Sequence, residues 1–170
     1  MKLFIAVVIY LSMAASAFAA DGTINFNGRI TKATCTVSTS KVEVNLPEVG
    51  ATALAVKGTT GGDTPFDIVL TGCGIVGGPA NVQVKFDGAK DSTNGNLLKI
   101  NSGNGNATGV GIGIYEKDGS TPINMAVLSR SIPVVKGETT LEFKAKYVAT
   151  GAPVTPGTVK ASTDFTLDYE

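Results

Sequence analysis

The 170-residue sequence contains no histidine and no tryptophan, and it has only two cysteines. Without histidine the chain cannot build a histidine-based catalytic triad, a Cys–His nucleophile or the usual zinc sites. Charge is sparse as well, because Asp, Glu, Lys and Arg together make up only 16% of the residues. The absence of histidine therefore excludes the commonest hydrolase and zinc-enzyme active sites.

The one long apolar run stands at the start of the chain. Lys2 precedes the run Leu3–Met13, and Ala17-Phe18-Ala19 supplies a small-x-small cleavage pattern. The run is too short to span a bilayer. We predict that residues 1–20 are a cleaved secretion signal, the alternatives being a membrane anchor or a buried strand. The remaining 150 or so residues suit one exported domain.

The charges that are present nearly cancel. The sequence has 14 basic and 14 acidic side chains, and loss of Lys2 with the signal gives the mature chain a net charge of about −1. A nucleic-acid-binding domain needs a basic footprint, and a membrane-surface protein needs a polybasic patch. We therefore expect neither nucleic acid nor a membrane surface as a partner.

Cys35 and Cys73 come after this export signal. In an oxidising compartment two cysteines favour a disulfide over two free thiols, which remain the alternative. The bridge would close a loop of about 39 residues and stabilise the fold by about 4 kcal/mol in the chain-entropy model.

From residue 33 onward, runs of alternating apolar and polar residues recur between turn signals. No window of comparable length has the 3.6-residue period of a helix, although residues 51–58 could form a helical turn, a short strand or a turn. Seven or eight strands at this spacing predict an antiparallel β-sandwich. The alternating runs are 42–46, 66–70, 82–86, 98–100, 110–114, 141–147 and 159–169.

No motif carries catalytic chemistry. Gly109–Gly113 lacks the full spacing of a nucleotide-binding loop, and the acidic and amide residues of 87–96 miss the EF-hand pattern. Carboxylates such as Asp67, Glu142 and Asp164 fall on the polar sides of strands, as in a solvated sheet face. We expect no enzyme activity, no cofactor and no metal site.

The first mature segment has an apolar face that is out of register with that of the next segment. Ile24, Phe26 and Ile30 lie on one face of an expected strand, with Gly28 in the fourth place. The apolar positions then become odd-numbered, at Ala33, Cys35 and Val37. One regular strand cannot bury both sets, so either a bulge lies near Thr31–Lys32 or two strands with different destinations meet there. We favour the second interpretation, in which residues 21–32 serve another molecule by strand addition.

In order and spacing, several short motifs resemble the structural subunits of chaperone–usher pili of the type 1 fimbrial kind. They are the signal, Ile24-x-Phe26-x-Gly28-x-Ile30, Ala33-Thr34-Cys35-Thr36-Val37, Phe66-Asp-Ile-Val-Leu-Thr-Gly-Cys73, Phe143-Lys-Ala-Lys-Tyr147-Val-Ala-Thr-Gly151 and the ending Phe165-Thr-Leu167-Asp-Tyr169-Glu170. The resemblance covers nearly the whole chain.

The resemblance implies an incomplete immunoglobulin-like β-sandwich over residues 33–170, completed by a donated strand. It implies that Ile24, Phe26, Gly28 and Ile30 of the extension 21–32 fill a neighbour's groove. A second set, Phe165, Leu167 and Tyr169, would line this chain's own groove and meet the chaperone first. The implied partners are other copies or related pilins, a periplasmic chaperone and an outer-membrane usher. The implied product is an adhesive fimbria on the cell surface.

Other interpretations remain open at this point. The apolar residues of the extension (Ile24, Phe26 and Ile30) could pack into their own domain as an ordinary first strand. Those of the last run (Phe165, Leu167 and Tyr169) could be ordinary core. The chain could be a secreted carbohydrate-binding β-sandwich, such as an adhesin or minor tip subunit, although it lacks tryptophan and a clustered acidic metal site. An exported hydrolase is remote because histidine is absent.

Overall fold

The computed structural model describes residues 35–38, 40–74, 78–151 and 153–170. The expected signal (1–20) and the expected extension (21–32) therefore lie outside the described residues. The elements of the described part are one short 3-10 helix and eight strands. They are β1 (Thr36–Val37), η1 (Ala51–Leu54), β2 (Thr60–Cys73), β3 (Asn81–Gly88), β4 (Val110–Glu116), β5 (Pro122–Ile123), β6 (Ile132–Pro133), β7 (Gly137–Ala149) and β8 (Thr163–Tyr169). In the described part of the chain, no helix has the length and apolar character needed to cross a membrane.

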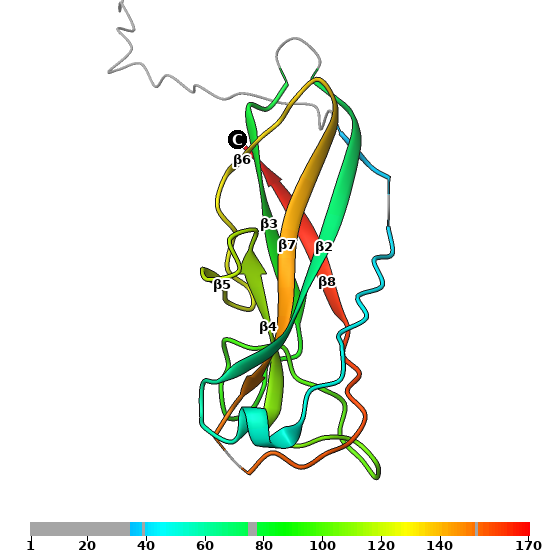
Figure 1. The fold of residues 1–170 in the computed structure, drawn as a ribbon. Helices are drawn as coiled ribbons and strands as arrows, with labels where there is room; N and C mark the ends of the chain where they lie inside the picture. The colour runs from blue at the N-terminus through cyan, green and yellow to red at the C-terminus, as the bar shows by residue number, and fades with distance from the viewer. Residues whose placement is uncertain (1–34, 39, 75–77, 152) are drawn as a thin grey trace, which may run out of the picture. The chain divides into compact units, whose positions relative to one another are not determined.

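The strands form two antiparallel sheets (Figure 1). The larger sheet has the order β1-β2-β7-β4-β5, and the smaller has the order β6-β3-β8. The longest pairing joins β2 to β7, where Phe66 lies opposite Phe143 and Ile68 opposite Leu141. The expected all-β sandwich is confirmed.

The core lies where the alternating apolar positions of the two sheets meet. Val82 and Val84 of β3, together with Leu141 of β7, have no exposed surface. The rings of Phe86 and Phe143 meet edge to face with centroids 5.4 Å apart, so one strand from each sheet contributes to the aromatic centre. An edge-to-face pair of this kind adds about 0.5–1.5 kcal/mol beyond its buried area.

Three of the expected strands differ from what the sequence predicts. Residues 42–46 are extended but belong to no sheet, and residues 98–100 contribute only isolated bridges of Leu98 to Lys90 and to Ile112. The last run is regular only from Thr163 onward. In each case the alternation is present, but among the described residues no continuous partner strand is available to pair with it.

The predicted disulfide is present and joins Cys35, next to β1, to the last residue of β2, Cys73. The two Cα atoms are 4.4 Å apart, and the cysteines are 38 positions apart in the sequence. β1 is only two residues long and pairs with Thr71 and Leu70 alone, so it makes few bonds of its own to the sheet. The bridge therefore supplies much of the attachment of this end of the chain.

Replacing both cysteines by serine is expected to reduce stability by about 3–4 kcal/mol, because the unfolded chain loses a cross-link that closes a long loop. Urea titration of the purified protein, followed by the β-sheet circular dichroism signal, measures this loss. Reduced wild-type protein should show the same shift in midpoint. A midpoint that does not move after reduction would contradict the stabilising role.

Candidate functional site

β8 is an edge strand whose outer side has no partner in the described part of the chain. It pairs only with β3, in a register that places Phe165 opposite Phe86 and Leu167 opposite Val84. In Figure 1 it is the red arrow that ends near the C-terminus. An unpaired edge presents a row of backbone N–H and C=O groups that can accept another strand.

The hydrogen bonds at the end of β8 show which of its residues present these groups. Asn81 and Glu170 exchange both backbone bonds, with N···O distances of 3.3 and 3.0 Å. In an antiparallel pair, hydrogen-bonded and non-hydrogen-bonded residue pairs alternate along the strand. The even-numbered residues of β8 therefore bond to β3, and the odd-numbered residues direct their N–H and C=O groups toward the open edge. Those residues are Thr163, Phe165, Leu167 and Tyr169.

The same odd-numbered residues carry the apolar side chains of β8. Phe165, Leu167 and Tyr169 pack against the buried core, yet they are only half buried, whereas the facing Val84 and Phe86 of β3 are fully buried. Burial nevertheless raises the pKa of the Tyr169 phenol above its usual value. The core is thus incompletely covered along β8. The even-numbered side chains of the strand are exposed to solvent.

A second unpaired segment borders the same core. In residues 40–49, Val42, Val44 and Leu46 are half buried and pack on the core cluster, while the residues between them are exposed. None of the backbone groups of residues 40–49 is hydrogen-bonded to the backbone of another described residue. On the exposed side, Lys41 Nζ lies 2.7 Å from Glu43 Oε1, and this pairing lowers the pKa of the Glu43 carboxyl.

Phe66 of β2 shows where the uncovered core lies between these edges. Its ring contacts Phe86 and Phe143, with centroids 6.3 and 5.7 Å away, but it is only half buried, unlike both of these neighbours. An aromatic ring at the centre of a sandwich is normally covered on all sides. We define the open site as Phe66, the half-buried residues of β8 and those of segment 40–49.

The sequence predicted only part of this site. It singled out Phe165, Leu167 and Tyr169, which the structure places together on one strand. It offered no reason to select Phe66 or segment 40–49, because alternation reports which side chains are apolar and not whether their backbone is paired. Ile24, Phe26, Gly28 and Ile30 lie outside the described residues.

The described residues contain no cluster of three or more possible metal ligands. Asp91 Oδ1 accepts hydrogen bonds from the backbone N–H groups of Thr93 and Asn94, both 2.9 Å away, so this carboxylate stabilises a turn. Asp118 does the same for Ser120 and Thr121, and these bonds hold its pKa well below the usual range.

Comparisons with known proteins show the family of the chain. The family model described as "Fimbrial protein" matches residues 24–170. Long polar fimbria protein A of Salmonella typhimurium is 39% identical over 160 residues, covering 91% of this chain and 89% of that protein.

Two solved structures are also similar. One is an antigen and type I fimbria protein of Burkholderia pseudomallei, with a TM-score of 0.63, 35% identity and coverage of 87% of this chain and 97% of that one. The other is the P pilus rod subunit PapA, which shares the fold with a TM-score of 0.68 at 23% identity, covering 81% of this chain and 100% of that one. The chain belongs to the fimbrial protein family, and it is a non-enzymatic structural subunit of a cell-surface fimbria.

Proposed function

We propose that the subunit polymerises by strand addition, in which residues 21–32 of one copy insert between β8 and segment 40–49 of the next. The observation that best supports this proposal is the open edge of β8. The residues of β8 whose backbone groups are unpaired are also those whose apolar side chains are half buried. A strand laid along this edge would pair with the backbone and cover the core at the same time.

The proposed donor matches the acceptor in length and pattern. Residues 24–30 and Thr163–Tyr169 are both seven-residue stretches with three large apolar side chains at alternating positions. Burying Ile24, Phe26 and Ile30 would contribute roughly 5–9 kcal/mol at about 1.5–3 kcal/mol each. Each backbone hydrogen bond would add about 0.5–1.5 kcal/mol. Their sum exceeds an association cost of several kcal/mol.

The open core needs cover before assembly. A half-exposed cluster that includes Phe66, Phe165 and Leu167 would aggregate in a free subunit. We propose that a periplasmic chaperone covers the open core by lending a strand to β8. We further propose that this strand is exchanged for residues 21–32 of the next subunit at an outer-membrane usher. Export to the periplasm is consistent with the expected signal at residues 1–20.

A peptide of residues 21–32 tests the proposal on the chaperone-bound subunit. We expect the peptide to displace the chaperone, because it supplies both the apolar side chains and the backbone partners. A Gly28→Leu peptide should react at least about tenfold more slowly, since it adds a large side chain to the face that enters the core. Size-exclusion chromatography measures the released chaperone over time.

The matched control is an Asn27→Leu peptide, which carries the same added side chain on the opposite face. It should displace the chaperone at a rate close to that of the unmodified peptide. Equal slowing by both substitutions would contradict the proposed facing of Gly28. Failure of the unmodified peptide to displace any chaperone would contradict strand addition itself.

A further inference from the structure

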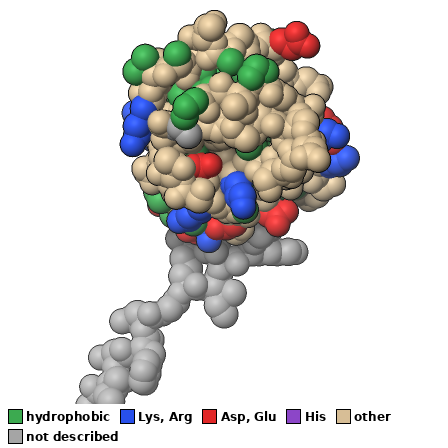
Figure 2. All heavy atoms as spheres, turned by 90° about the horizontal axis from the view of Figure 1, so that it is seen from below, with side chains coloured by type: hydrophobic (Ala, Val, Ile, Leu, Met, Phe, Trp, Pro, Cys, Tyr) green, Lys and Arg blue, Asp and Glu red, His purple; other side chains and the backbone are tan. Residues whose placement is uncertain are grey.

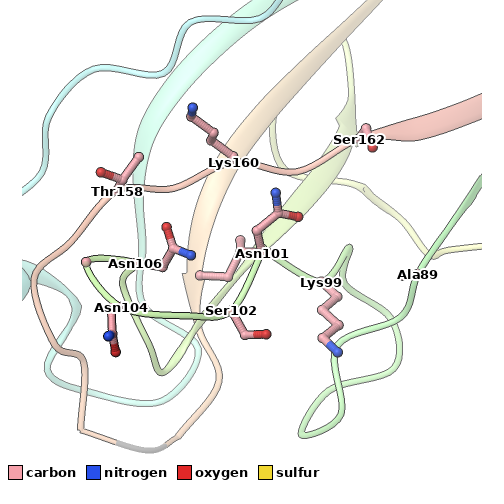
Figure 3. Close-up of a pocket in the computed structure, with 11 residues that line it drawn as sticks. Ala89, Lys99, Asn101, Ser102, Asn104, Asn106, Thr158, Lys160 and Ser162 are labelled. Carbon is pink, nitrogen blue, oxygen red and sulfur yellow. The ribbon is translucent and has the colours of Figure 1, made fainter.

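A polar pocket lies at the end of the domain where β3 ends and β8 begins, and no residue of β8 lines it. It is an open pocket of about 730 Å³ between the loop of residues 99–106 and the segment 158–162 (Figure 3). The two walls are tied together by backbone hydrogen bonds. Asn101 N–H donates to Lys160 C=O and Thr158 N–H donates to Gly105 C=O, both at 2.8 Å. The pocket is therefore held in shape by the fold.

The pocket is cationic. Lys99 and Lys160 line it from opposite sides in Figure 3, and its lining includes no Asp or Glu. Neither lysine forms an ion pair with another residue of the described chain, whereas Lys41, Lys85, Lys117, Lys144 and Lys146 each do. Figure 2, which views this end of the domain, shows mainly uncharged polar side chains and backbone, with basic, acidic and hydrophobic groups scattered among them. The ammonium groups of Lys99 and Lys160 point away from one another in Figure 3, so a bound anion would draw one of these side chains inward, and it would meet no lining carboxylate.

The uncharged lining is rich in unused hydrogen-bonding groups. It offers three amides and three hydroxyls, and none of these side chains is hydrogen-bonded to another described residue. They are Asn101, Asn104, Asn106, Ser102, Thr158 and Ser162. An Asn amide presents an acceptor beside its donors, which suits a hydroxyl that both donates and accepts. At the back of the pocket Ile100 is buried, with 7% of its surface exposed.

We propose that this pocket binds an acidic saccharide, a sugar whose ring carries a carboxylate. Lys99 or Lys160, with its side chain turned toward the pocket, would meet the carboxylate, and the amides and hydroxyls would meet the ring hydroxyls. The volume suits one or two sugar rings, since small-ligand sites span about 300–1,000 Å³. Charge and hydrogen bonds take the place of an aromatic platform, so each site binds weakly.

Polymerisation would compensate for this weakness. A fibre repeats the pocket once per subunit, and multivalent attachment raises overall binding by about 10²–10⁴-fold without any new contact. This gain rests on the proposed function, whereas binding by a single pocket does not. Because the pocket lies outside Thr163–Tyr169, insertion of a strand along β8 would not fill it.

The test measures binding of 3′-sialyllactose and digalacturonate to purified fibres, with lactose as the neutral comparison. We expect saturation-transfer NMR to detect both acidic sugars and to detect lactose at least about tenfold more weakly. A Lys99→Ala, Lys160→Ala double variant should bind the acidic sugars about tenfold more weakly, which corresponds to about 1.4 kcal/mol. An Asn106→Ala variant should weaken binding without removing its salt dependence.

Lys136→Ala is the matched control, because Lys136 is an exposed lysine outside the pocket lining. It should bind like the wild type. Equal binding of lactose, unchanged binding by the double variant, or competition by sulfate as strong as that by the acidic sugars would each overturn the proposal. Electron microscopy of every variant separates the two hypotheses, since fibres that form but do not bind overturn only the saccharide site. For a variant that forms no fibres, the same titration is made on the chaperone-bound subunit.

Discussion

A chain that lacks Asp21–Ile30 is expected to form no fibres, although a chaperone should still hold it in solution. The deletion removes the proposed donor strand and leaves the acceptor unchanged, because β8, Phe66 and segment 40–49 all lie outside it. The proposed donor supplies three large apolar side chains worth roughly 5–9 kcal/mol in total. Without it, the open site of each subunit stays unfilled by its neighbour, so polymerisation should fall to the background level. Electron microscopy of cell-surface fibres and co-purification with the chaperone measure the two outcomes.

The control changes the opposite face of the same segment. Replacing Asn25 and Asn27 by serine alters side chains that alternate with the apolar set and would point away from the neighbour's core. These fibres should form at nearly the wild-type level. Normal fibres from the deletion would refute strand addition, and loss of fibres from the serine variant alone would refute the assignment of the two faces.

The sequence was most informative where burial alternates within a single strand. The runs around Phe66, Val84, Ile112, Phe143 and Leu167 all became strands of the sandwich, because a period of two places apolar side chains on one face whatever the partner is. The two-residue strands β5 and β6 were missed. Two residues are too few to show a period, and their pairing depends on neighbours that are distant in the sequence.

The sequence could not predict which strands would find a hydrogen-bonded neighbour. Residues 42–46 alternate as regularly as those of β3, yet their backbone bonds to no described backbone, while β3 is paired on both sides. The difference arises from tertiary structure, since a strand completes its hydrogen bonds only if a neighbour is there. The polar pocket was missed for the same reason, because Asn101 and Lys160 meet only after the chain has folded.

Replacing Leu167 by aspartate is expected to prevent both chaperone capture and fibre formation. Leu167 lies opposite the fully buried Val84 and packs on the core, so the new carboxylate would enter an apolar site. Burying an unpaired charge costs several kcal/mol, which is comparable to the whole stability of a small domain. The soluble subunit in the periplasm should fall at least about tenfold, as measured by immunoblot, and no fibres should appear.

Thr166→Asp is the matched control, one residue away on the same strand. Thr166 is exposed and lies opposite Lys85, so a carboxylate there stays in water beside a cation. This variant should accumulate and polymerise like the wild type. If both variants failed, β8 would be sensitive to added charge on either face, and the assignment of its odd-numbered residues to the open site would be wrong. If Leu167→Asp alone assembled normally, the half-buried face of β8 would be ordinary surface, and the strand-addition site would have to lie elsewhere. Only failure of Leu167→Asp with survival of Thr166→Asp fits an edge strand whose odd-numbered residues offer backbone and apolar side chain to the same incoming strand.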